Sequence, residues 1–172
     1  MNIIVTDCDK TKLLALESIA RGHFGSSFKI ITVEKKEFDA PLSFANLEKT
    51  AGERILHISN SFDKTEYGKD TLYYATLQKG FVESYHKNWM VVAYALFKKE
   101  KGAWFPGTGE WVSIPSKLRP FITLPEKERY KKFYEVCPIL KEQALITFCV
   151  GVEEREWFKR AFNSCIKESI TT

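Results

Sequence analysis

Polar residues whose side chains could bind a ligand or take part in catalysis cluster near the start of the chain, at Asp7, Asp9, Thr11 and Lys12. They follow the apolar run 2–6 and precede a stretch with apolar residues at helical spacing, which predicts a strand, a tight turn and a helix ended by Gly25. A helix N-terminus offers unpaired N–H groups and a partial positive charge, so it suits an anion such as phosphate. In open α/β sheets ligands lie outside the carboxyl ends of strands. The turn is therefore the first candidate for a ligand site.

The remaining elements must position this turn. Alternating and β-branched residues predict strands at 28–33, 71–77, 88–97, 103–105 and 110–114, and the apolar run 144–150 reads as one more. Amphipathic spacing predicts helices at 43–58, 126–136 and 153–169. Polar, glycine and proline clusters predict turns at 80–87 and 106–109. This order predicts an α/β layout with an antiparallel middle and αβα ends.

Composition limits the classes of function. The 172 residues are 44% hydrophobic and 28% charged, as in soluble globular proteins. A net charge of +4 suits an anionic ligand and is too small to indicate nucleic-acid binding. No run approaches a membrane span or a signal peptide, and the four cysteines form no C-x-x-C pair. These features predict a cytoplasmic protein with reduced thiols and no membrane contact.

The stretch Asp7-Cys-Asp9-Lys-Thr11 resembles the D-x-D-x-T signature of haloacid-dehalogenase-type phosphatases. That resemblance implies that Asp7 attacks phosphorus, that Asp9 acts as general acid and base, and that Mg²⁺ holds the phosphate. The family also carries a late acidic pair after a strand, whereas this chain reads Gly151-Val-Glu-Glu after 144–150. This reading is one alternative.

A second resemblance spans nearly the whole chain, to the non-canonical purine nucleotide phosphatases of the inosine/xanthosine triphosphatase type. That family opens with a strand and Thr-Asn-x-x-Lys, matched here by Cys8-Asp-Lys-Thr-Lys12. The family's later features, in order, are a strand ending in Val-Glu, a helical Ala-Gly-x-Arg, an acidic residue before x-Gly, a Lys-Glu-Gly-Ala and a Thr-Arg. Their counterparts are Val33-Glu34, Ala51-Gly-Glu-Arg54, Gln78-Lys-Gly80, Lys141-Glu-Gln-Ala144 and Glu154-Arg155.

This resemblance implies one α/β domain over 1–172, with a central mixed, twisted sheet flanked by helices, and a homodimer. It also implies binding, and Mg²⁺-dependent hydrolysis, of a purine nucleoside triphosphate of the ITP or XTP type. The phosphate-binding residues that it implies are Thr6, Lys12, Arg54, Lys141 and Arg155. Asp9 and Glu83 would be the metal ligands and, with Gln78, the catalytic positions.

Gln78 stands where this family has its catalytic glutamate. Glutamine keeps the shape and the hydrogen bonds but cannot act as a base and is a poor Mg²⁺ ligand. Three alternatives follow. Asp7, Asp9 and Glu83 rebuild a metal site, or the protein binds nucleotide without hydrolysis as a pseudoenzyme, or the fold serves as an interaction module, since function lives in sites and not in folds.

Overall fold

A mixed β-sheet forms the centre of the computed structural model, which describes residues 1–6, 9–33, 42–67 and 71–171. Within these residues the sheet has six strands in the order β2-β1-β3-β4-β5, with β6 paired to β4. Three strands are mutually parallel, namely β1 (Asn2–Thr6), β2 (Lys29–Val33) and β3 (Leu72–Glu83). The antiparallel strands are β4 (Trp89–Lys99), β5 (Trp104–Thr108) and β6 (Val112–Ser113). The predicted α/β class with a mixed sheet is confirmed.

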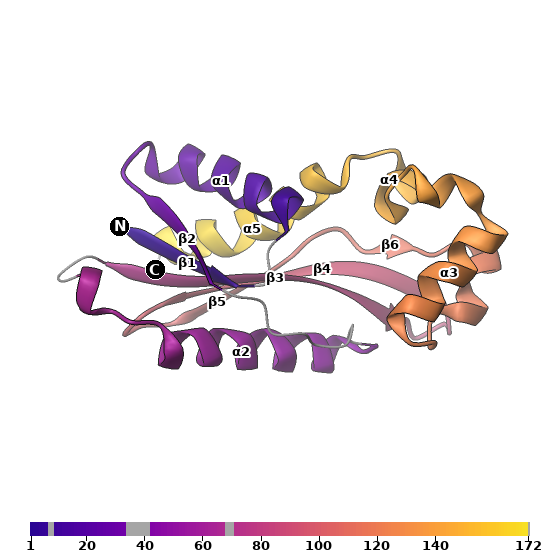
Figure 1. Cartoon of the computed structure of the whole chain (residues 1–172), viewed down its shortest axis with the longest axis horizontal. Coiled ribbons are helices and arrows are strands. Elements are labelled where there is room, and N and C mark those ends of the chain that lie inside the picture. Colours follow the sequence, from indigo (N-terminus) through magenta and orange to yellow (C-terminus); the bar gives the residue numbers. More distant parts are fainter. Residues whose placement is uncertain (7–8, 34–41, 68–70, 172) are drawn as a thin grey trace.

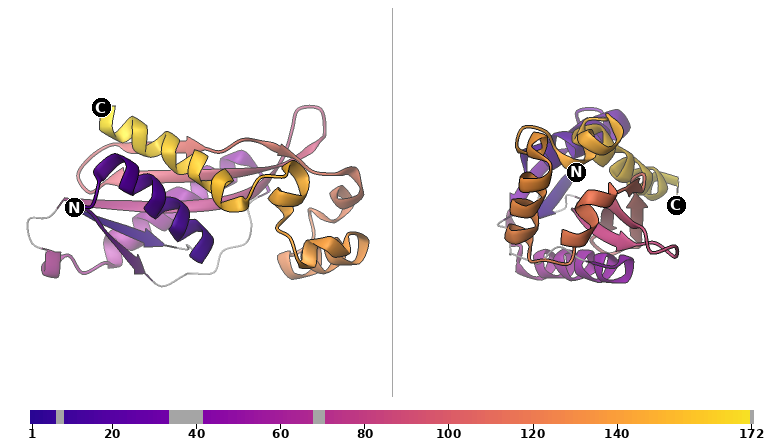
Figure 2. Two further views of the ribbon diagram at one scale, coloured as in Figure 1. Left: turned by 90° about the horizontal axis from the view of Figure 1, so that it is seen from above. Right: turned by 90° about the vertical axis from the view of Figure 1, so that its right-hand side faces the viewer.

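Helices cover both faces of the sheet, as Figure 1 shows. One face carries α1 (Lys10–Phe24) and α5 (Glu154–Thr171), and the other carries α2 (Phe44–Ser61). The orange segments at one end of the long molecule in Figure 2 are α3 (Glu126–Val136) and its neighbours. The neighbours of α3 are η2 (Ser116–Phe121), η3 (Pro138–Lys141) and α4 (Leu145–Val150). A further 3-10 helix, η1 (Thr65–Tyr67), follows α2. No helix in the described ranges is long and apolar enough to span a membrane.

Strand alternation divides the core between the two faces. Ile3, Leu77 and Phe81 belong to the apolar cluster beneath α1 and α5, whereas Ile4 and Tyr74 belong to the cluster beneath α2. Because successive strand residues point to opposite faces, odd-numbered residues of β3 face α1 and α5, and even-numbered residues face α2. This rule assigns a face to each polar residue of β3.

The ends of α1 and α2 follow from their capping residues. The Asp9 carboxylate accepts a hydrogen bond from the backbone N–H of Lys12 at 3.0 Å, and the Ser43 hydroxyl accepts one from Asn46 at 3.1 Å. At the other end of α1, Gly25 has a φ of 63°, which favours glycine. The predicted helix start after the opening turn and its stop at Gly25 are both confirmed.

The segment 144–150 is helix α4, so its prediction as a strand is wrong. A short apolar run fits a buried strand or a buried helical turn equally well. Here Leu145 and Ile146 are buried against the rest of the core, and Gly151 ends the helix with a φ of 68°. The Gly151 N–H donates to the Thr147 carbonyl at 2.8 Å, which closes the last turn.

The predicted turn at 80–87 begins too early, and the one predicted at 106–109 is wrong. Residues 80–83 continue β3, where Gly80 pairs with Val92, and the hairpin turn follows only after Glu83. Residues 106–108 lie in β5, where they pair with residues 94–96 of β4, and α5 packs against this strand. A Cβ on Gly107 would lie 2.4 Å from the Ala161 carbonyl oxygen, so the glycine is required by packing and not by a turn.

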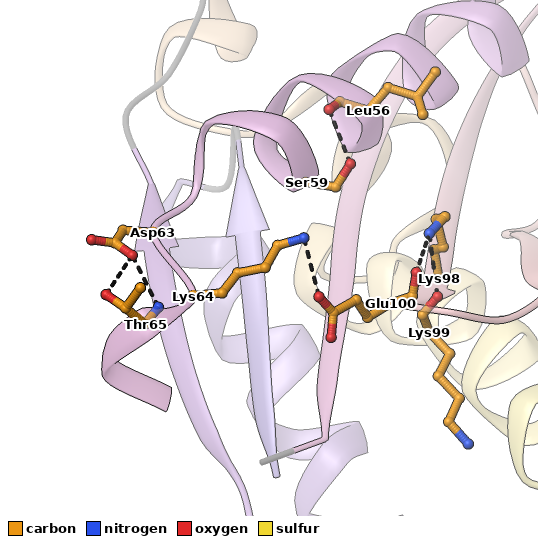
Figure 3. A network of polar contacts seen from close by, with 8 residues as sticks. All are labelled: Leu56, Ser59, Asp63, Lys64, Thr65, Lys98, Lys99 and Glu100. Carbon is orange, nitrogen blue, oxygen red and sulfur yellow. Dashed lines mark hydrogen bonds and ion pairs between the residues drawn. The ribbon is translucent and has the colours of Figure 1, made fainter. Parts of the chain in front are cut away.

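A polar network ties the end of α2 to the β4–β5 hairpin (Figure 3). The Lys64 ammonium lies 3.1 Å from a carboxylate oxygen of Glu100. The Lys98 ammonium donates to the backbone carbonyls of Lys99 and Glu100 at 3.3 and 2.9 Å. Burial, with the nearby charge of Lys64, lowers the pKa of Lys98 below its usual range. Lys64 and Lys98 therefore have a structural role, which is to hold the segment after α2 and the hairpin together.

Candidate functional site

The C-terminal edge of β1 is where the predicted site residues can meet. Thr6, the last residue of β1, pairs in register with Thr76 of β3. β3 continues to Glu83, beyond the last residue of β1. Gln78 lies two residues past Thr76, roughly 7 Å along the strand at about 3.3 Å per residue. The structure therefore brings Thr6 and Gln78 to the same edge of the sheet.

Gln78 is a buried polar residue with unmet hydrogen-bonding capacity. It is 2% exposed, faces α2 and lies opposite Tyr94 of β4, whose pKa burial raises to about 12. Within the described part of the chain, neither its amide nitrogen nor its amide oxygen has a hydrogen-bond partner, and the Thr76 hydroxyl is also unpaired. A buried amide without partners costs on the order of 1–3 kcal/mol. A ligand that bonds this amide would remove that cost.

The start of α1 supplies a cap and a cation. The Asp9 side chain is 63% exposed, and its second oxygen lies 3.9 Å from the Lys12 ammonium. The Lys12 side chain is only 17% exposed, so its charge is held beside the helix N-terminus. Asp7 and Cys8, which the phosphatase alternative requires, lie outside the described residues, as do Glu34 and Pro41.

Arg54 is a buried cation of α2. It is 7% exposed in α2, which packs on the face that Gln78 also occupies. Thr6 is 4% exposed and points to that face as well, because Ile4 of the same strand does. Thr6, Gln78 and the helix that carries Arg54 therefore share one face of the sheet.

Glu83 lies far from Asp9, its predicted partner in metal binding. It ends β3 seven residues beyond Thr76, roughly 23 Å along the strand at about 3.3 Å per residue. Its side chain is exposed beside the hairpin. Within ranges 1–6, 9–33, 42–67 and 71–171, no three His, Cys, Asp or Glu side chains gather as metal ligands would. The described residues do not fit the Mg²⁺ site that the resemblance implies.

Lys141 and Arg155 lie on other elements. Lys141 is exposed at the end of η3 and lines a pocket with α3. Arg155, in the first turn of α5, lies 3.7 Å from carboxylate oxygens of both Glu153 and Glu156. Its charge is therefore partly balanced by its own neighbours. Their predicted role in phosphate binding stays a prediction.

A charged pair on the other face of β3 escaped the sequence interpretation. The Lys79 ammonium lies 2.8 Å from a carboxylate oxygen of Glu154 at the start of α5. Burial alone would lower the pKa of Lys79, but the neighbouring Tyr130 and Glu154 outweigh it and raise this pKa above its usual range. The alternation of β3 carries a signal for this pair, because it puts a lysine on an apolar face between Leu77 and Phe81.

Lys79 and Glu154 line a cavity of about 230 Å³ at the α1 and α5 side of the sheet. Aromatic residues of α3 and mostly apolar residues from the segment before α5 complete its wall: Tyr130, Phe133, Tyr134, Leu140, Gln143, Ala144 and Leu145. The cavity and Gln78 therefore lie on opposite faces of one strand, one residue apart in the sequence.

Comparisons with known proteins establish the fold. No family model and no curated protein sequence matches the chain. Protein VC0702 of Vibrio cholerae has a TM-score of 0.73 and 15% identity, with 98% of this chain and 94% of that chain covered. A nucleoside-triphosphatase / dITP/XTP pyrophosphatase of Mycobacterium abscessus has a TM-score of 0.41 and 14% identity, covering 83% and 97%. On the first of these matches, the chain has the α/β fold of VC0702, a mixed sheet with helices on both faces.

Proposed function

We propose that this protein binds a purine nucleoside triphosphate of the ITP or XTP type at the C-terminal edge of β1, and that Gln78 prevents efficient hydrolysis. The observation that carries the proposal is the buried Gln78 amide, which has no hydrogen-bond partner in the described chain. The motif resemblance supplies the class of ligand. The proposal makes the protein a nucleotide-binding pseudoenzyme.

The phosphates would lie against the N-terminus of α1. Backbone N–H groups and the helix dipole favour an anion there, and the Lys12 ammonium lies beside them. Arg54 adds a second cation from α2, with the planar geometry that suits phosphate. The Thr6 hydroxyl and the Gln78 amide would donate hydrogen bonds to the ligand.

Hydrolysis would need a base that Gln78 cannot provide. An amide binds no proton at neutral pH and cannot activate water. Asp9 is exposed and is already engaged in capping α1, while Glu83 lies roughly 23 Å from the register level of Thr6 at about 3.3 Å per residue. The described residues therefore offer neither a general base nor a set of Mg²⁺ ligands. We also propose that the protein forms the homodimer that the resemblance implies.

A thermal-shift screen tests nucleotide binding. We expect ITP and XTP at 1 mM to raise the melting temperature, with and without Mg²⁺, because ligand that binds only the folded state stabilises it. Lys12→Gln should remove most of the shift. The matched control is Lys101→Gln, which removes one exposed lysine from the β4–β5 hairpin. No shift with any nucleotide would refute the proposal and leave an interaction module.

A phosphate-release assay tests the role assigned to Gln78. Wild-type protein should release no phosphate from ITP, whereas Gln78→Glu restores the family residue and should release it with Mg²⁺. Rapid turnover by wild type that is abolished by Asp7→Asn would instead favour the aspartyl-phosphatase alternative. Sedimentation velocity with and without ITP tests the homodimer.

A further inference from the structure

A second pocket, which we call the α3 pocket, lies on the outer side of α3. Its volume is about 420 Å³, within the range of small-molecule sites. Its walls come from two elements, with Lys141 of η3 facing the α3 residues Lys127, Tyr130, Lys131, Tyr134 and Glu135. Tyr130 and Tyr134 also line the 230 Å³ cavity, so the two hollows meet at these rings.

The α3 pocket concentrates positive charge. Three lysines line it against one glutamate, in a chain whose net charge is only +4. The Glu135 carboxylate is engaged by Lys132, whose ammonium lies 2.7 Å away and is not part of the pocket wall. None of the ion pairs among the described residues involves Lys127, Lys131 or Lys141. Lys131 also lies close enough to Glu135 to help lower the pKa of that carboxyl, so the single acid of the wall is shared between Lys131 and Lys132. The three lysines from two elements therefore leave the pocket with an excess of positive charge.

Aromatic rings give this pocket a second kind of surface. The ring centroids of Tyr130 and Tyr134 lie 6.1 Å apart with an interplanar angle of 37°. Both side chains are half-buried, so part of each ring is open to a ligand. Tyrosine rings beside lysines suit a ligand with a planar ring and several negative charges, because stacking and charge pairing act together.

We propose that the α3 pocket is a second anion site, which binds a nucleoside polyphosphate with its phosphates among Lys127, Lys131 and Lys141 and its base on the tyrosine rings. The site is separate from the one at the edge of β1 and does not depend on it. It gives Lys141 a role alongside α3 residues and not alongside Lys12. Tyr130 joins the two regions, since it also neighbours Lys79 in the deeper cavity.

Isothermal titration calorimetry with ITP in EDTA tests the two sites separately. Lys127→Gln/Lys131→Gln should weaken one class of sites by at least about tenfold, since each lysine contributes about three- to fivefold. The matched control, Lys101→Gln/Lys167→Gln, removes the same charge from exposed positions elsewhere and should change affinity less than about twofold. Equal affinity for ITP in the two double variants would overturn the proposal that the α3 pocket binds nucleotide.

The variants also separate this proposal from the proposed function. Loss of binding in the α3 double variant alone supports the α3 pocket and counts against the edge of β1. Loss of binding in Lys12→Gln alone supports the site at the edge of β1 and counts against the α3 pocket. If Lys12→Gln and the α3 double variant each lose a different class of binding sites, both proposals are supported. All four lysines of the double variants are exposed, so the folds should be preserved.

Tripolyphosphate and inosine test the chemistry of the ligand. ITP should bind the α3 pocket more tightly than tripolyphosphate, and inosine should bind weakly. Tyr134→Leu should lower the affinity for ITP by about fivefold or more and leave that for tripolyphosphate unchanged. Tripolyphosphate binding as tightly as ITP would overturn the nucleoside part of the proposal.

Discussion

The ammonium nitrogen of Lys79 lies 2.8 Å from a carboxylate oxygen of Glu154, 75 positions later in the chain. Their side chains are only 25% and 20% exposed, so the charges are largely removed from water. The pair joins the middle of β3 to the first turn of α5. It is therefore both a structural link and part of the wall of the 230 Å³ cavity.

Glu154→Gln should lower the free energy of unfolding at pH 7 by about 1–3 kcal/mol, because it leaves the Lys79 charge without its partner. Since the pKa of Lys79 is raised in the folded state, the stabilisation is complete below the unfolded lysine pKa of about 10.4. It is lost as the pH rises through the higher folded value. Urea unfolding from pH 7 to 11 should show a constant difference between wild type and variant up to about pH 10, which begins to narrow above the unfolded lysine pKa of about 10.4.

The control for that series is Glu153→Gln. The Glu153 side chain is 72% exposed and lies 3.7 Å from Arg155, so its removal should change stability by less than about 0.5 kcal/mol. An equal loss in both variants would mean that general charge, and not the pair with Lys79, determines the effect.

Asp9→Ala should destabilise the protein by about 1 kcal/mol, because the backbone N–H of Lys12 loses its acceptor. Asp9→Asn keeps a capping oxygen and should restore most of the stability. Urea unfolding of both variants separates the cap from any role in ligand binding. A loss of nucleotide-induced stabilisation in Asp9→Asn, without a loss of stability, would identify the carboxylate as part of the site.

Gln78→Leu should raise the free energy of unfolding by about 1 kcal/mol, since it replaces a buried amide without partners by an apolar side chain. The same variant should lose the nucleotide-induced thermal shift. Differential scanning calorimetry with and without ITP measures both quantities. Lower stability in this variant would mean that the amide is satisfied by part of the protein and is not held open for a ligand.

Gly107→Ala should destabilise the fold by about 2–4 kcal/mol. The new Cβ would lie 2.4 Å from the Ala161 carbonyl oxygen and 2.7 Å from the Cys165 backbone nitrogen, so α5 must move away from β5. Gly52→Ala is the control, because nothing lies within 4 Å of its new Cβ in α2. Urea unfolding should show that variant to be unchanged or stabilised by about 0.5–1 kcal/mol.

Local signals predicted the elements whose ends depend on nearby residues. The opening strand, the stop at Gly25 and the helix over 126–136 match the structure because capping and amphipathic spacing act within a few residues. The run 144–150 was ambiguous because its length and apolar character suit two kinds of structure. Gly107 was wrongly predicted to lie in a turn, because the residues that require a glycine there are more than 50 positions away in the sequence, in α5.

The candidate site was predictable in part for the same reason. The strand–turn–helix pattern led to Asp9 and Lys12, and motif order led to Gln78 at the same edge. The partnership of Lys79 with Glu154 depends on how α5 packs over β3, which no local pattern encodes. The distance of Glu83 from Asp9 follows from the unexpected length of β3.

Gln78 and Lys79 are neighbours in β3, yet they serve opposite faces of the sheet. A shift of one residue in the pairing of β3 with β4 would send the ammonium towards α2 and the amide towards α5. An insertion near the hairpin tip, for example at the exposed Tyr85, would therefore be tolerated only if the added residues lengthen the turn and leave the pairing of β3 with β4 unchanged. Single substitutions can change the chemistry of either face, but a change in the register of β3 would change both faces at once.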